Sequence, residues 1–146
     1  VHMFPDASIP VVQLSLNKYL SPKEAYKLGE KLQSLRDEGY LIMGSGNIVH
    51  NLRLLEWENP SGTPATIEFD RYIADAVLAN DTDKVINYAQ HPQANYAVPT
   101  PDHYLPLIYI MGASQGAQPT VFNQSYNSGS LSMTGFIFED EPQNIL

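Results

Sequence analysis

The stretch YLIMGSGNIVHNL, residues 40–52, decides how the rest of the sequence is interpreted. Residues 40–46 form an apolar run typical of a buried strand, and Gly44 and Gly46 permit a tight turn after it. Residues 47–57 then follow a helical pattern. In an open parallel α/β sheet, ligands collect beyond the carboxyl ends of the strands. His50 would lie about one turn into this helix, so it is the first candidate for a functional side chain.

The segment before this stretch completes a βαβ pattern. Residues 9–16 (IPVVQLSL) predict a second buried strand, and residues 21–39 predict a helix between the two strands. Ser21 and Glu24 make a capping box at the start of that helix, and Gly39 is placed to end it. A strand–helix–strand unit of this length predicts parallel pairing. We therefore expect an α/β fold of three layers, in which helices flank a mostly parallel central sheet.

The second half of the chain carries further helical and strand patterns, with no internal repeat and no clear linker. The expected elements are helices over 65–81, 83–90 and 102–114, a proline-rich loop over 91–101, and two strands within 119–140 joined by a turn at 127–129. At 146 residues the chain is long enough for one compact core, so we expect residues 1–146 to belong to a single domain.

Composition excludes several classes of function. The chain has 16 acidic residues against 8 Lys and Arg, and the net charge of −8 disfavours nucleic acid as a partner. There is no cysteine, so disulfides and zinc–thiolate sites are excluded and a metal must use His, Asp, Glu or water. No apolar run approaches the ~18 residues that span a membrane, which predicts a protein without membrane contact and a cytoplasmic location.

Four histidines are candidates for chemistry, and each also has a purely structural interpretation. His50 is either a functional group at the strand–helix junction or a core histidine with its hydrogen bonds satisfied. His103 lies in the first turn of a predicted helix, where the neutral, metal-binding form of imidazole is favoured, or it is a surface histidine beside a proline turn. His91 is expected at a helix end, against the last carbonyl groups, and His2 carries little signal.

Five motifs in order resemble one known family. They are FPDASIPVVQLSL (4–16), LRDEG (35–39), GSGNIVHNLR (44–53), PTPDHYLPLIYIMGA (99–113) and GSLSM (129–133). Together they resemble the 4,5-DOPA extradiol dioxygenases, within the class III, LigB-like ring-cleaving dioxygenases. The resemblance extends from about residue 4 to about residue 137, and it implies a LigB-like form of the α/β fold.

The resemblance also implies a reaction and a site. In such enzymes a mononuclear metal, Fe(II) or in some recovered proteins Zn(II), binds a catechol through both hydroxyl oxygens, and O2 opens the ring next to the diol. His50 matches a histidine at the metal centre, as a ligand or as the acid–base residue beside it. His103 matches a metal ligand. Asn51 and Tyr104 adjoin these positions and are expected to contribute to the substrate pocket.

One departure from the family is large. Its members carry further metal-binding histidines in an N-terminal half, within an H-G-S-P-type turn and a later strand, and no H-G pair occurs here. We therefore expect this chain to correspond to the C-terminal part of a longer one, to need the missing N-terminal half as a partner, and to be inactive alone. An exposed sheet edge would also permit a homo-oligomer.

Two other functions compete with the dioxygenase. The chain could be a non-catalytic α/β binding or interaction domain that retains the scaffold. It could also be a zinc-dependent hydrolase, since ligation by histidine alone suits zinc. Dependence on metal and oxygen would separate these alternatives.

Overall fold

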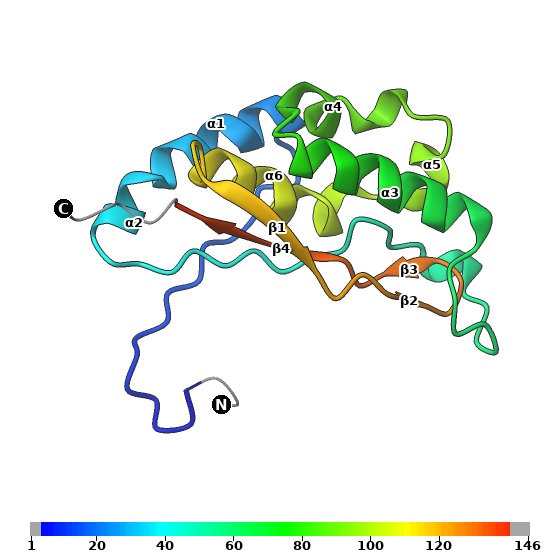
Figure 1. Ribbon diagram of the computed structural model, residues 1–146, viewed down its shortest axis with the longest axis horizontal. Coiled ribbons are helices and arrows are strands. Elements are labelled where there is room, and N and C mark those ends of the chain that lie inside the picture. The colour runs from blue at the N-terminus through cyan, green and yellow to red at the C-terminus, as the bar shows by residue number, and fades with distance from the viewer. Residues whose placement is uncertain (1–3, 141–146) are drawn as a thin grey trace.

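The computed structural model describes residues 4–140, and its elements are shown in Figure 1. His2 lies outside the described residues. The α-helices are α1 (Pro22–Leu32), α2 (Ser34–Asp37), α3 (Pro64–Leu78), α4 (Thr82–Ile86), α5 (Ala94–Ala97) and α6 (Leu105–Ala113). The 3-10 helices are η1 (Leu52–Leu54), η2 (Tyr88–Gln90) and η3 (Pro101–His103). The strands are β1 (Gln118–Phe122), β2 (Tyr126–Asn127), β3 (Leu131–Ser132) and β4 (Gly135–Glu139).

Helix α1 begins at the predicted capping box. The Glu24 amide donates to the Ser21 hydroxyl at 3.3 Å, and the Ser21 amide donates to the Glu24 carboxylate at 2.8 Å. The helix ends at Leu32, and the short helix α2 follows it before Gly39, whose φ of 86° needs a glycine. The local signals therefore place the start of the helix correctly, although the predicted single helix is divided in two.

Helices α1 and α6 cross in close contact. A Cβ atom added at Gly29 would collide with the Tyr109 carbonyl of α6, and one added at Gly112 would collide with the Tyr26 carbonyl of α1. Two glycines facing each other let the helix backbones approach more closely than larger residues permit. This contact fixes α6, and with it the segment that precedes α6.

The hydrophobic core lies between α3, α6 and the segment that contains His50. Phe69, Ile73 and Val77 form the buried stripe of α3, at the spacing expected of an amphipathic helix. Leu105 and Ile108 of α6 are fully buried as well. Within residues 4–140, none of the helices has the length and apolar character needed to cross a membrane.

The strands form two small antiparallel sheets. β1 pairs with β4, with Gln118 opposite Glu139 and Phe122 opposite Gly135, and β2 pairs with β3. The predicted turn at 127–129 joins β2 to β3, and positive φ angles occur at Ser128 (49°) and Gly129 (72°). The prediction of two strands within 119–140 is therefore only partly right. The segment holds four strands, and the turn at 127–129 joins the short strands β2 and β3, whereas β1 and β4 pair with each other on either side of that hairpin.

The predicted parallel sheet is not found among the described residues. Segments 9–16 and 40–46 are extended but pair with no strand there, and parallel pairing is limited to an isolated bridge between Gly62 and Gly129. Residues 47–57 do not form the predicted helix either. This segment instead contains the isolated β-bridge between His50 and Leu131, followed by the short 3-10 helix η1. A strand exists only where a neighbour supplies hydrogen-bond partners, so an apolar pattern alone cannot complete one.

Candidate functional site

His50 and His103 lie against each other. The centroids of their imidazole rings are 3.6 Å apart and the ring planes differ by 7°, so the rings stack face to face. His50 forms an isolated antiparallel bridge with Leu131 of β3, and His103 is the last residue of η3. The fold therefore brings together the two histidines that the sequence singles out, although they come from distant segments.

Backbone hydrogen bonds hold the His50 segment in place on both sides. On one side, the Asn47 amide donates to the His103 carbonyl at 2.8 Å, and the His50 amide donates to the Ala97 carbonyl at 2.9 Å. On the other side, the Ser132 amide donates to the Val49 carbonyl at 3.0 Å. The segment is thus fixed between the residues around His103 and the β2–β3 hairpin.

Gly46 permits the close approach of these two segments. A Cβ atom at this position would collide with the backbone carbonyl of His103. Because the obstacle is backbone, it cannot move aside as a flexible side chain can. The second glycine of the GSG sequence is therefore required by packing against His103, and not by the strand-to-helix turn that the sequence predicts.

The surroundings of His50 change its pKa. Burial, followed by the nearby positive charge of a protonated His103, lowers the pKa of His50. The neutral imidazole that results at neutral pH has a free lone pair, which can accept a proton or bind a metal. The position therefore suits chemistry that needs a neutral imidazole.

Asp102 supports the second histidine. Its Oδ2 lies 2.7 Å from His103 Nδ1, which is buried, but the angle leaves Nδ1 without a hydrogen bond. The Thr100 side chain, and to a smaller degree His103, lower the pKa of the Asp102 carboxyl, which favours its charged form. The His103 side chain as a whole is 42% exposed, so its accessible edge is the one that carries Nε2. A carboxylate behind an imidazole is a common arrangement for a metal-binding histidine.

Asn51 and Tyr104, the predicted pocket residues, are buried beside the pair. The Asn51 amide group donates to the Tyr96 carbonyl at 2.7 Å and accepts from the Arg53 amide at 3.2 Å. Tyr104 is 1% exposed, and its hydroxyl donates to the Val85 carbonyl at 3.0 Å. Both side chains have hydrogen-bond partners within the protein, and their role toward a substrate stays a prediction.

A buried carboxylate, Asp70, binds the hairpin next to His50, and the sequence patterns do not predict this role. Asp70 of α3 is fully buried and accepts hydrogen bonds from the hydroxyls of Ser132, Thr134 (3.0 Å) and Tyr126 (3.1 Å). The Ser132 hydroxyl also accepts from the Thr134 amide at 3.2 Å. Asp70 thus joins α3 to the hairpin that holds the His50 segment.

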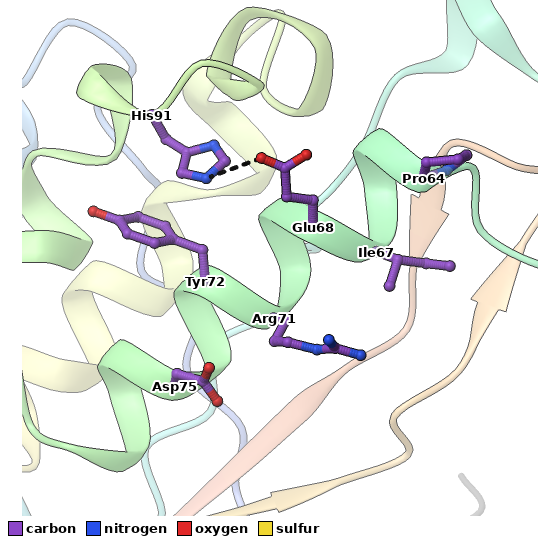
Figure 2. Close-up of a pocket in the computed structure, with 7 residues that line it drawn as sticks. All are labelled: Pro64, Ile67, Glu68, Arg71, Tyr72, Asp75 and His91. Atoms are coloured by element: carbon purple, nitrogen blue, oxygen red, sulfur yellow. Dashed lines mark ion pairs between the residues drawn. The ribbon is translucent and has the colours of Figure 1, made fainter.

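His91 takes part in a separate groove, shown in Figure 2. Its amide donates to the Tyr88 carbonyl at the end of η2, which confirms the predicted helix-end position. Its ring contacts the Tyr72 ring, with centroids 4.5 Å apart, and lies 3.8 Å from the Glu68 carboxylate. Neither His50 nor His103 lines this open groove.

Residues 112–116 (GASQG) match the Gly-x-Ser-x-Gly pattern of serine hydrolases, but their structure differs from the one that pattern has in those enzymes. Such a serine sits on a sharp turn between a strand and a helix. Ser114 instead follows the end of α6, and its hydroxyl donates to the Ile110 carbonyl at 2.7 Å. The structure gives no support to a serine nucleophile at this position.

The described residues supply part of a metal site. Imidazole suits Fe(II) and Zn(II), and His103 offers a free Nε2 backed by a carboxylate. Within residues 4–140, however, no group of three or more His, Cys, Asp or Glu side chains could hold a metal ion. The imidazole of His103 therefore fits such a metal, but residues 4–140 do not bring together enough further ligands to complete the site.

Comparisons with known proteins agree with the family resemblance of the sequence. Residues 2–139 match the family model described as the catalytic LigB subunit of aromatic ring-opening dioxygenase. The chain is 39% identical over 138 residues to 4,5-DOPA dioxygenase extradiol of Escherichia coli (strain K12), and 33% identical over 138 residues to the protein of the same name from Beta vulgaris. These alignments cover 91% and 93% of this chain but 51% and 52% of the relatives.

A solved structure shows the same arrangement of the chain. The crystal structure of an uncharacterized protein from Escherichia coli K12 superposes with a TM-score of 0.85 at 37% sequence identity. The superposition covers 92% of this chain and 57% of that one. The chain thus spans about half the length of the relatives that it matches.

Proposed function

Since the chain belongs to the family of the catalytic LigB subunit of aromatic ring-opening dioxygenases, we propose that it contributes one part of an extradiol dioxygenase site that acts on catechols. The observation that carries the proposal is the contact between His50 and His103. These residues lie in two of the five motifs that resemble the family, and their rings stack against each other.

The two histidines have different roles in this proposal. In-plane lone pairs of two parallel rings 3.6 Å apart do not converge on one point, so the stacked pair does not suit joint ligation of one ion. His103, whose Nε2 is accessible and whose Nδ1 faces Asp102, is assigned as the metal ligand. His50 is assigned as the acid–base residue beside it.

The lowered pKa of His50 suits this assignment. A catechol must lose protons to chelate a metal, and a neutral imidazole next to the metal can accept one of them. After ring opening the same residue can return the proton to the product. Backbone hydrogen bonds on both sides of its segment keep His50 beside His103 throughout. Held in this way, the base needs little reorganisation during the reaction.

Fe(II) is the proposed cofactor of the active enzyme. Zn(II) is the alternative, as the metal that would occupy the site in purified protein. A bound metal would supply Lewis-acid chemistry that lowers the pKa of the diol and brings the catechol and O2 together. His103 of this chain would bind it. The further ligands would come from outside the described arrangement, which is why the isolated chain is expected to show little turnover.

An oxygen electrode tests the proposal. The chain is assayed with added Fe(II) and a panel of catechols that includes DOPA, alone and joined to the part of the E. coli relative that it does not match. We expect oxygen uptake and a yellow ring-opened product from the joined protein, and little from the chain alone.

Two variants complete this assay. His50→Asn is expected to abolish most turnover, and His91→Ala, in the separate groove, to leave turnover within about twofold. Absence of oxygen uptake across the whole panel, or equal turnover in the His50→Asn and His91→Ala proteins, would contradict the proposal.

A further inference from the structure

Two extended segments expose an unusual amount of apolar surface. In residues 9–16, Val11 and Val12 are 87% and 85% exposed. In residues 40–46, Leu41 and Met43 are 71% and 67% exposed. Figure 1 shows the first segment, drawn in blue before α1, leaving the body of the molecule. We call these two segments together the apolar surface.

Most of the backbone of the apolar surface lacks hydrogen-bond partners among the described residues, although the Tyr40 amide donates to the nearby Leu35 carbonyl. Within the described part of the chain, no backbone hydrogen bond joins residues 9–16 or 41–46 to another segment. Extended chains with free amide and carbonyl groups pair readily with an added strand. Val11 and Val12 are neighbours and point to opposite faces of an extended chain, so each face of this segment carries an exposed valine. Strands that are apolar on both faces belong in the interior of a covered sheet.

Charge also distinguishes the apolar surface from the rest of the molecule. Residues 7–17 and 39–49 contain no Asp, Glu, Lys or Arg, although the chain carries a net charge of −8. Large obligate interfaces are similarly apolar and poor in charge at their centre. A second copy of this chain would bring a further eight negative charges, which disfavours it as the occupant.

The comparisons indicate which polypeptide fits this surface. The E. coli crystal structure contains a counterpart for 92% of this chain, and this chain accounts for only 57% of that structure. We propose that the apolar surface binds the remaining portion of a LigB domain, on the same polypeptide or a separate one, through strands that pair with residues 9–16 and 40–46. This inference rests on membership of the family and not on catalysis.

The proposed partner has a defined chemistry. It must present apolar, uncharged strands with free backbone hydrogen-bonding groups, because those are the complements of the apolar surface. The second segment continues through Gly46 into the His50 site, where Gly46 packs on the His103 carbonyl. A strand paired with residues 40–46 would therefore end near the imidazole pair, where the metal site needs further ligands.

Co-expression tests the inference. The whole 146-residue chain is produced with the portion of the E. coli relative outside the matched region, and the complex is analysed in chelator so that no metal contributes. We expect a 1:1 complex by size-exclusion chromatography with light scattering, in which amides of residues 9–16 and 40–46 exchange hydrogen at least tenfold more slowly than in the chain alone. Because no turnover is measured, failure of the proposed dioxygenase activity leaves this result unaffected.

Matched variants locate the contact. Val12→Lys and Leu41→Lys change exposed side chains, so the free chain should keep its melting temperature while binding weakens at least tenfold. Trp57→Lys changes a side chain that is 80% exposed and lies outside both segments, and it should bind normally. The inference is overturned if no complex forms, if the two lysine variants bind as well as Trp57→Lys, or if the chain alone assembles with itself through residues 9–16.

Discussion

The imidazole rings of His50 and His103 stack with their centroids 3.6 Å apart and their planes nearly parallel, at 7°. One ring belongs to a segment bridged to the β2–β3 hairpin, and the other belongs to the 3-10 turn before α6. The distance between the rings therefore depends on how two backbones pack, and the predictions below concern the residues that control this packing.

Gly46 controls the approach of the two segments. Substitution by alanine would push a methyl group into the His103 carbonyl and disturb its hydrogen bond with the Asn47 amide. We expect Gly46→Ala to lower the free energy of unfolding by about 1–3 kcal/mol, as overpacking against a fixed backbone does. Urea denaturation measures this change.

Ser45→Ala is the matched control for Gly46→Ala, since Ser45 is the exposed neighbouring residue. It should change the free energy of unfolding by less than about 0.5 kcal/mol. Equal stability of the two variants would show that the Gly46 contact is unimportant.

Asp70 anchors the hairpin that supports His50. Asp70→Ala would leave three hydroxyl groups, on Tyr126, Ser132 and Thr134, without their acceptor in a buried site. We expect a loss of about 2–4 kcal/mol in the free energy of unfolding, because unsatisfied buried polar groups are costly. Asp75→Ala, an exposed change on the same helix, should cost less than about 0.5 kcal/mol. Similar losses in the two variants would argue against the anchor.

Tyr126 makes stability depend on pH in the alkaline range. Burial, and then the nearby Asp70 carboxylate, raise the pKa of Tyr126 to about 12 from a usual value of 10.0. Between these pH values the unfolded chain releases the Tyr126 proton and the folded chain keeps it. The contribution of Tyr126 to the free energy of unfolding is therefore complete below pH 10 and is lost as pH rises toward 12. Tyr126→Phe should remove this part of the alkaline loss of stability.

The measurement for Tyr126 is the free energy of unfolding against pH, with tyrosinate absorbance recorded in parallel. Tyr40→Phe serves as control, because Tyr40 is 55% exposed and its removal should leave the alkaline loss in place. A wild-type profile that Tyr126→Phe does not alter between pH 10 and 12 would contradict the assigned contact with Asp70.

Local signals in the sequence predict the positions of helices α1 and α3. The capping box at Ser21 and Glu24 places the start of α1, and the periodic apolar residues of 65–81 predict α3, which spans Pro64–Leu78. Both depend on residues within a few positions of each other, so the sequence contains the necessary information.

Features that depend on distant residues could not be predicted in the same way. Segments 9–16 and 40–46 have the composition of strands, but pairing needs a neighbour that the described residues do not provide. Asp70 resembles any polar residue within a helix, because its three partners lie far along the chain. His50 and His103 were connected through their family motifs, since neither position alone reveals the other.

The division of roles between the two histidines is the central claim, and Zn(II) titration followed by nitrogen-15 NMR of the histidine side chains tests it most directly. This measurement detects weak binding to the chain as it is, and it identifies which ring nitrogen contacts the metal. The account predicts a ligation shift at Nε2 of His103, no ligation of His50, and no effect on His91. Simultaneous ligation of His50 and His103, or binding at His91 without His103, would contradict it.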